Sequence, residues 1–169
     1  MTTAFIITAA TVFSTLSQVS GTPSDSQYFY NADFQNGKVS QVNVLNKDGK
    51  YLSNKLSYRY TYDAQDRLIE KQAFLWDNTQ HEWREYQVQR YDYASNQMTM
   101  TLSRWNKATK SYELAERYEY TRMMDNVVAL TKEKFDFTNK TCSKAVNAKK
   151  DVAISTEKVL LLSPGNDLA

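Results

Sequence analysis

The sequence predicts an all-β protein, an antiparallel meander of about eight to ten strands built from repeated hairpins. Three observations predict this fold: tyrosines that alternate along extended segments, the recurrence of these segments, and the polar turn residues between them. Alternation with a period of two is typical of a strand with one apolar face. The tyrosine pairs recur after 31 and then 27 residues, and such a period is typical of a repeated supersecondary unit. The pairs are Tyr60/Tyr62, Tyr91/Tyr93 and Tyr118/Tyr120. We therefore expect a coiled sheet, a barrel or a sandwich-like body.

The composition fits one β-domain and excludes several classes of protein. A chain of 169 residues is long enough to bury a sizeable core. Aromatic residues make up 13%, and the twelve tyrosines among them favour pleated sheet. The 21 basic and 19 acidic residues are interspersed, which argues against the clustered basic surface of a nucleic-acid-binding protein. The single cysteine excludes an intrachain disulfide and a multi-cysteine metal site.

The N-terminal segment predicts export. Residues 1–24 carry no charged side chain, and Ala4–Val12 is an apolar run of the length found in signal peptides. No lysine or arginine follows Met1, but Gly21 suits cleavage after it and charge begins at Asp25. We expect a signal peptide over 1–24 and a secreted or periplasmic protein. The run is too short to span a bilayer, so no transmembrane segment is expected. The alternative is a first strand.

Residues 25–142 are predicted to form the β-hairpin domain. Asn36-Gly37 lies between two alternating apolar segments and predicts a tight hairpin turn, because both residues tolerate positive φ. Further turns are expected at 46–49 and 63–66. The alternation changes phase around Gln89–Arg90, which predicts a β-bulge at that point.

Each expected hairpin ends in two bulky residues that lie seven positions apart. These pairs are Trp76/Trp83, Trp105/Tyr112 and Phe135/Cys142. The pattern stops after the last pair, so residues 143–169 are predicted to form an atypical C-terminal cap or a tail. Within this segment, Val152–Thr156 and Lys158–Leu162 are candidate short strands.

Two resemblances extend this interpretation. Residues 58–68 (YRYTYDAQDRL) resemble the YD (RHS-type) repeat, in which a Tyr-Asp pair precedes a turn and an Arg-Leu pair begins the return strand. The matching residues are Tyr62, Asp63, Arg67 and Leu68, and the later copies do not keep them. The export-like N-terminus with its aromatic hairpins resembles a family of small secreted proteins of unknown function from Bacteroides-type gut bacteria. This resemblance implies an antiparallel β-protein outside the cytoplasm and supplies no catalytic residues.

The sequence shows no catalytic set, so we expect no enzyme activity, no cofactor and no metal site. His81 is the only histidine and lies in a polar turn, which predicts a solvated residue. Cys142 has only this distant histidine as a candidate base, and it takes the place of Trp83 and Tyr112 in the other copies. We therefore expect Cys142 to pack as a small apolar residue.

The surplus of aromatic residues predicts a non-catalytic extracytoplasmic binding or interaction module. Aromatic rings exposed on a rigid sheet can stack on sugars or capture a protein strand. The ligand is expected to be a glycan or a protein of the cell envelope, and not a nucleic acid. The alternative is that the rings form the core. The candidate ligand-binding residues are Trp76, Trp83, Trp105 and Tyr112.

A second hypothesis is a hydrolase of the glycosidase type that uses two carboxylates. The chain has many acidic residues in the hairpin domain, and nothing in the sequence singles out two of them. The ordinary explanation is alternating charge on the wet face of a sheet. The residues are Asp63, Asp66, Glu70, Glu82, Glu85, Glu113, Glu116 and Glu119.

Overall fold

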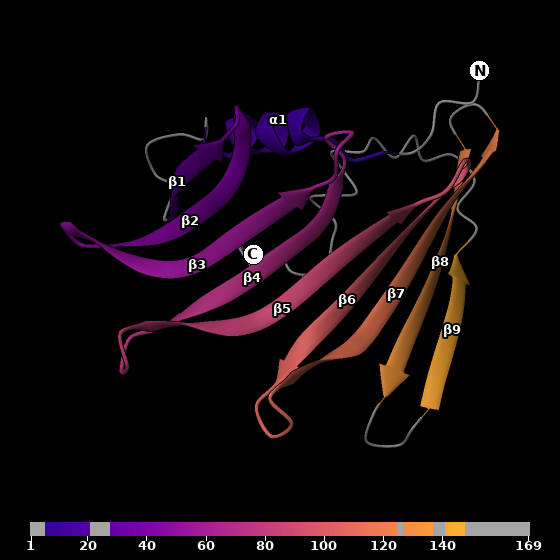
Figure 1. The fold of residues 1–169 in the computed structure, drawn as a ribbon. Helices are drawn as coiled ribbons and strands as arrows, with labels where there is room; N and C mark the ends of the chain where they lie inside the picture. Colours follow the sequence, from indigo (N-terminus) through magenta and orange to yellow (C-terminus); the bar gives the residue numbers. More distant parts are fainter. Residues whose placement is uncertain (1–5, 21–27, 125–126, 137–140, 148–169) are drawn as a thin grey trace.

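A computed structural model of the chain describes residues 6–20, 28–124, 127–136 and 141–147. Its nine strands form one antiparallel sheet in which each strand pairs with its neighbours in the sequence (Figure 1). The elements are α1 (Ala9–Ser20), β1 (Tyr28–Gln35), β2 (Lys38–Asp48), β3 (Tyr51–Tyr62), β4 (Leu68–Asp77), β5 (Glu82–Tyr93), β6 (Gln97–Asn106), β7 (Ser111–Met124), β8 (Val127–Asp136) and β9 (Thr141–Asn147). The edge strands β1 and β9 do not pair with each other, so the sheet is open. The predicted meander is confirmed, and it is neither a barrel nor a sandwich.

The turns follow the residues that tolerate a left-handed backbone. Asn36 and Gly37 join β1 to β2 with φ angles of 52° and 75°, as the hairpin signal predicts. The second turn is shorter than predicted, because Asn46 and Asp48 still belong to β2 and Gly49, with φ of 60°, begins the turn. This extension of β2 keeps Asn46 in the sheet, where it takes part in the candidate site described below.

The side chain of Asp63 closes the turn between β3 and β4. Its Oδ1 accepts hydrogen bonds from the backbone N–H of Gln65 at 3.0 Å and of Arg67 at 2.9 Å. Its Oδ2 accepts a hydrogen bond from Arg67 Nε at 2.6 Å. Partial desolvation raises the pKa of Asp63, but these hydrogen bonds outweigh it and leave the pKa below its ordinary value. The predicted turn at 63–66 is therefore confirmed, with Asp66 at a φ of 62°.

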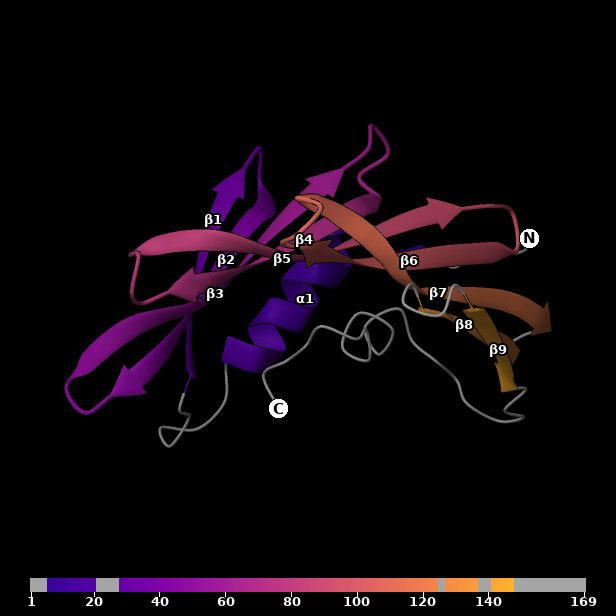
Figure 2. The same ribbon diagram turned by 90° about the horizontal axis from the view of Figure 1, so that it is seen from below.

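Helix α1 lies against one face of the sheet, which we call the helix face (Figure 2). Residues that pair across neighbouring strands point to the same face, so the register assigns each strand residue to one of the two faces. All three tyrosine pairs of the sequence pattern point to the helix face. The opposite side is the outer face. The buried cluster of the helix face consists of Ile7, Val12, Val39, Val42, Leu68, Tyr91, Met98, Met100, Leu102, Tyr118 and Tyr120.

The predicted β-bulge lies at a different position. In β5 the extra residue is Tyr86, because Gln87 pairs with Ala73 while Glu85 pairs with Phe74. The expectation of a bulge around Gln89–Arg90 is wrong. Val88 is buried on the outer face and Tyr91 on the helix face, so the change of phase in the sequence reflects burial on both faces.

The N-terminal segment forms a helix, so the alternative of a first strand is wrong. Thr8 caps this helix: its Oγ1 accepts a hydrogen bond from Thr11 N at 3.4 Å, and Thr11 Oγ1 accepts one from Thr8 N at 3.3 Å. The helix is not long and apolar enough to cross a membrane, nor is any other in the part of the chain that the structure describes. The signal peptide stays a prediction.

The sheet continues past the predicted domain boundary at residue 142, because β9 extends to Asn147. Cys142 lies in this strand opposite Phe135 and is exposed, so the expectation that it packs as an apolar residue is wrong. The candidate strands Val152–Thr156 and Lys158–Leu162 lie outside the described residues.

Candidate binding pocket

The four aromatic residues predicted to bind a ligand occupy the ends of two different hairpins. Trp76 packs edge-on against Trp83, with ring centroids 5.0 Å apart and an angle of 68° between the rings. Trp105 and Tyr112 repeat this arrangement, again at 5.0 Å and 68°. All four side chains are half-buried. The β4–β5 and β6–β7 hairpin ends project separately in Figure 1, so the residues form two pairs and not one continuous surface.

A hydrogen bond to Tyr112 fixes the position of the second pair. Tyr112 OH accepts a hydrogen bond from the side-chain amide of Gln72 at 2.9 Å, which links β7 to β4. Burial raises the pKa of Tyr112, while this hydrogen bond lowers it by a smaller amount. Tyr112 therefore holds neighbouring hairpins together on the outer face.

The first pair, in contrast, borders a cavity. Trp76 lines a cavity of about 310 Å³ that is bordered by residues of β1, β2, β3, β4 and the β4–β5 turn. We call this cavity the Tyr28–Trp76 pocket. Its wall combines two aromatic rings with three asparagine amides, a serine hydroxyl and a lysine. The lining residues are Tyr28, Asn46, Ser53, Asn54, Lys55, Leu75, Trp76 and Asn78. Trp83 packs behind Trp76 and holds its ring in place.

Two features of the pocket wall concern its polar groups. Lys55 Nζ donates a hydrogen bond to Tyr28 OH at 2.7 Å and lies 4.1 Å from the centroid of the same ring. The lysine is therefore engaged in positioning Tyr28. Asn46 Oδ1 is buried and has no hydrogen-bond partner among the residues that the structure describes. A buried acceptor without a donor is costly, and such groups in native proteins are often part of functional sites.

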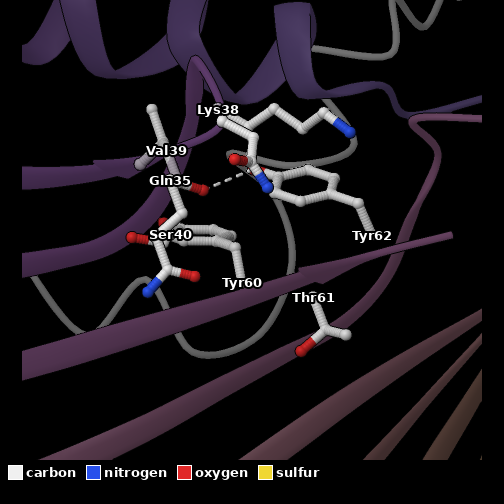
Figure 3. A pocket seen from close by; sticks show the side chains of 8 residues that line it. Gln35, Lys38, Val39, Ser40, Tyr60, Thr61 and Tyr62 are labelled. Atoms are coloured by element: carbon white, nitrogen blue, oxygen red, sulfur yellow. Dashed lines mark hydrogen bonds between the residues drawn. The ribbon is translucent and has the colours of Figure 1, made fainter. Parts of the chain in front are cut away.

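A second cavity, of about 300 Å³, lies beside the β1–β2 turn and the end of β3 (Figure 3). Some of its polar side chains are engaged within the protein. Tyr62 OH donates a hydrogen bond to the carbonyl oxygen of Val39 at 2.9 Å, and Lys38 forms an ion pair with Asp66. None of the four aromatic residues predicted to bind a ligand lines this cavity.

Several acidic residues of the hydrolase hypothesis form ion pairs, whereas Glu113 accepts hydrogen bonds from Asn106 and Thr109. Glu70 accepts a hydrogen bond from Arg90 at 2.9 Å, and Glu116 lies 3.2 Å from Lys132. Burial raises the pKa of Glu116, but hydrogen bonds from Tyr118 and Lys132 outweigh it, so that the pKa is lower than its ordinary value. A glycosidase acid needs the opposite shift. The hydrolase hypothesis remains an untested prediction.

The described residues also show where the remaining candidates lie. His81 is exposed in the β4–β5 turn, where its backbone N–H donates to the carbonyl oxygen of Asp77 at 2.8 Å. Among the described residues, no group of three His, Cys, Asp or Glu side chains lies close enough together to hold a metal ion.

The sequence profile of a family of unknown function, DUF3836, matches residues 1–124. The chain belongs to the DUF3836 family. A crystal structure of a DUF3836 protein from Bacteroides vulgatus is 30% identical with a TM-score of 0.52, and the alignment covers 53% of this chain and 92% of that one. The predicted resemblance to a Bacteroides-type family of unknown function is therefore confirmed. The whole lining of the Tyr28–Trp76 pocket lies within the matched residues.

Two further solved structures match the chain. A protein of unknown function from Bacteroides fragilis is 18% identical with a TM-score of 0.63, and the alignment covers 73% of this chain and 94% of that one. At this identity the similarity shows a shared fold alone. A DUF3836 protein from Parabacteroides distasonis is 20% identical with a TM-score of 0.48, over 72% of this chain and 89% of that one. No protein with a curated description matches the chain.

Of the residues that line the pocket, the sequence predicts Trp76 but not Tyr28 or Asn46. The sequence predicts Trp76 as a ligand-binding residue, but it places Asn46 in a turn and does not single out Tyr28. Asn46 shares the parity of Val42 and Val44 along β2, so the local pattern does not single it out. Nor does this pattern show that β1 brings Tyr28 opposite Asn46, which is a consequence of the hairpin register.

Proposed function

We propose that this DUF3836 protein is a non-catalytic extracytoplasmic binding module whose Tyr28–Trp76 pocket binds an uncharged glycan. The observation that carries the proposal is the pocket wall itself, in which two aromatic residues lie beside three asparagines. A sugar ring presents apolar C–H groups on its face and hydroxyl groups at its edge. The aromatic rings suit the face, and the amides suit the hydroxyls.

The size and charge of the pocket favour a small uncharged ligand. A volume of about 310 Å³ lies at the lower end of the range for small-molecule sites, which suits a short glycan better than a protein segment. The lining contains no carboxylate, and its only cation, Lys55, is bonded to Tyr28. A cationic ligand would find no carboxylate among these lining residues, and one of the three N–H donors of Lys55 is occupied by Tyr28.

The other predicted aromatic residues support this site in different ways. We propose that Trp83 positions Trp76, because the two rings are in edge-on contact. Trp105 and Tyr112 form the same arrangement on another hairpin and do not line the pocket. We assign these two residues a structural role.

Two further proposals concern the location of the protein and the kind of repeat that its hairpins form. The predicted signal peptide over 1–24 supports a secreted or periplasmic protein. The Asp63–Arg67 hydrogen bonds give a physical reason for a Tyr-Asp…Arg-Leu motif, since the aspartate and the arginine close the turn between the two strands. Together with the tyrosine pairs on β3, β5 and β7, this geometry supports the proposal that the hairpins are YD-like repeats.

The test is binding of the full chain to a panel of uncharged oligosaccharides. Trp76→Ala is expected to abolish retention, whereas Trp105→Ala is expected to keep it. Trp105 is a matched control, because its ring contact has the same distance and angle as that of Trp76. Both variants are checked by circular dichroism for an intact sheet. Equal loss of binding in the two variants, or no binding by the natural chain, would contradict the proposal. The bound glycan should be recovered intact, and its cleavage would argue against a non-catalytic role.

A further inference from the structure

Residues 7–16 pack on the buried cluster of the helix face, and we call the surface that they cover the groove. It is separate from the Tyr28–Trp76 pocket. Ile7 is fully buried and Val12 is only 2% exposed. Leu16 packs against the same cluster, which includes Leu68 and Met98 from the sheet. The three side chains thus anchor an uncharged segment to the apolar centre of the sheet.

The main chain of this segment is bound as well as its side chains. The backbone N–H of Leu68 donates to the carbonyl oxygen of Ile7 at 2.8 Å, and the N–H of Ala9 donates to the carbonyl oxygen of Asp66 at 3.0 Å. Tyr93 OH donates to the carbonyl oxygen of Leu68 at 2.6 Å and lies 3.3 Å from that of Ile7. Between these contacts, Thr8 forms an isolated antiparallel bridge with Arg67. The sheet therefore recognises a short extended stretch that continues into a helix.

These contacts determine what kind of ligand the groove can hold. Without residues 7–16, the apolar cluster of the sheet would be open to water, and Leu68 N–H and Asp66 C=O would lose their partners. Both losses are unfavourable. A lipid chain would cover the apolar surface but would supply no backbone amides. A peptide supplies both, in a combination of strand addition and helix-in-groove binding.

We propose that this groove is a binding site for an uncharged apolar peptide segment of another protein, which enters when residues 1–21 are removed. The proposal rests on the predicted cleavage after Gly21, which is part of the extracytoplasmic function proposed above. In the uncleaved chain, residues 7–16 occupy the groove and keep the site closed. The groove and the glycan pocket use different residues, so each can fail without the other.

The test uses the full chain with a recognition sequence for a site-specific protease placed within residues 21–27. The folded protein is cleaved, the released fragment is removed by dialysis, and a fluorescent peptide of residues 6–20 is added. Binding is followed by fluorescence anisotropy, and unlabelled peptides compete. The Val12→Asp peptide is expected to compete at least about tenfold more weakly than the natural sequence, because Val12 is buried. The Ala10→Asp peptide is the control and should compete like the natural sequence, because Ala10 is exposed.

Three results would overturn the proposal. The first is that the cleaved protein does not bind the labelled peptide. The second is that the Val12→Asp and Ala10→Asp peptides compete equally, which would indicate non-specific adsorption. The third is that cleavage abolishes the β-type circular dichroism spectrum, which would make residues 7–16 an obligatory part of the core. Glycan retention by the same sample reports separately on the Tyr28–Trp76 pocket.

Discussion

The unpaired amide oxygen of Asn46 predicts that the pocket is built at the expense of stability. Asn46 lies in β2 with its Oδ1 buried and, among the described residues, without a hydrogen-bond donor. Leucine has a similar shape and no polar atoms. We expect Asn46→Leu to stabilise the ligand-free protein, because the substitution removes a desolvated acceptor and introduces a better strand residue.

The size of this effect follows from the cost of a buried polar group. Leaving such a group without a partner costs about 1–3 kcal/mol. With a slope of about 2 kcal/mol per M in urea, the unfolding midpoint should rise by about 0.5–1.5 M. The same variant should lose glycan retention, since Asn46 lines the pocket. Urea unfolding followed by tryptophan fluorescence measures the first effect, and the oligosaccharide panel measures the second.

Asn43 in the same strand provides a matched control. Its Oδ1 accepts a hydrogen bond from Gln41 Nε2 at 3.0 Å, so Asn43→Leu removes a satisfied interaction and should not raise the midpoint. Asn43 does not line the pocket, and its substitution should leave glycan retention unchanged. If Asn46→Leu is neutral or destabilising, or if Asn43→Leu gains as much stability, the reasoning about the unpaired oxygen is refuted.

Three further predictions concern the core and the titrating groups. Met100 is fully buried on the helix face, so Met100→Ala should lower the free energy of unfolding by about 2–5 kcal/mol, whereas Leu75→Ala at a 40% exposed position should lose far less in urea unfolding. The folded-state pKa of Glu116 lies below its ordinary value, so its stabilising effect is present above that value and is lost as the pH falls through the lowered pKa. Glu116→Gln should therefore flatten the acid side of a stability–pH profile, and an unchanged profile would contradict this. Burial raises the pKa of Tyr120 to about 12, so its contribution is present below the ordinary tyrosine pKa and is lost as the pH rises through about 12. In an alkaline titration followed by ultraviolet absorbance, Tyr120→Phe should reduce the tyrosinate absorbance that develops near pH 12. An equal reduction of the absorbance that develops near the ordinary tyrosine pKa would count against burial.

The features that the sequence predicts correctly depend on short-range physics. Positive φ at Asn36 and Gly37 is a property of those residues themselves, and the turn formed where it was expected. The alternation of Tyr60 and Tyr62 reflects the pleat of a single strand, and the structure places both residues on one face. A meander then follows, because short turns can join only antiparallel neighbours.

The features that the sequence does not reveal depend on register and on contacts between distant segments. The bulge at Tyr86 shifts β5 against β4, and nothing in the local pattern distinguishes it from two-sided burial of Val88 and Tyr91. Only pairing across β1 to β4 brings Tyr28 near Trp76. An apolar run such as Ala4–Val12 has the same composition whether it serves as an export signal or packs on a sheet.

The most direct test of the account is a two-dimensional NMR titration of the full chain with the retained oligosaccharide. The chain has three tryptophans, so the spectrum contains three indole N–H signals, which single Trp→Phe variants assign. We expect the Trp76 signal to shift with ligand concentration and the Trp105 signal to remain in place. A shift of Trp105 without Trp76, or no shift of any indole signal, would contradict the central claim that ligand binds between Tyr28 and Trp76.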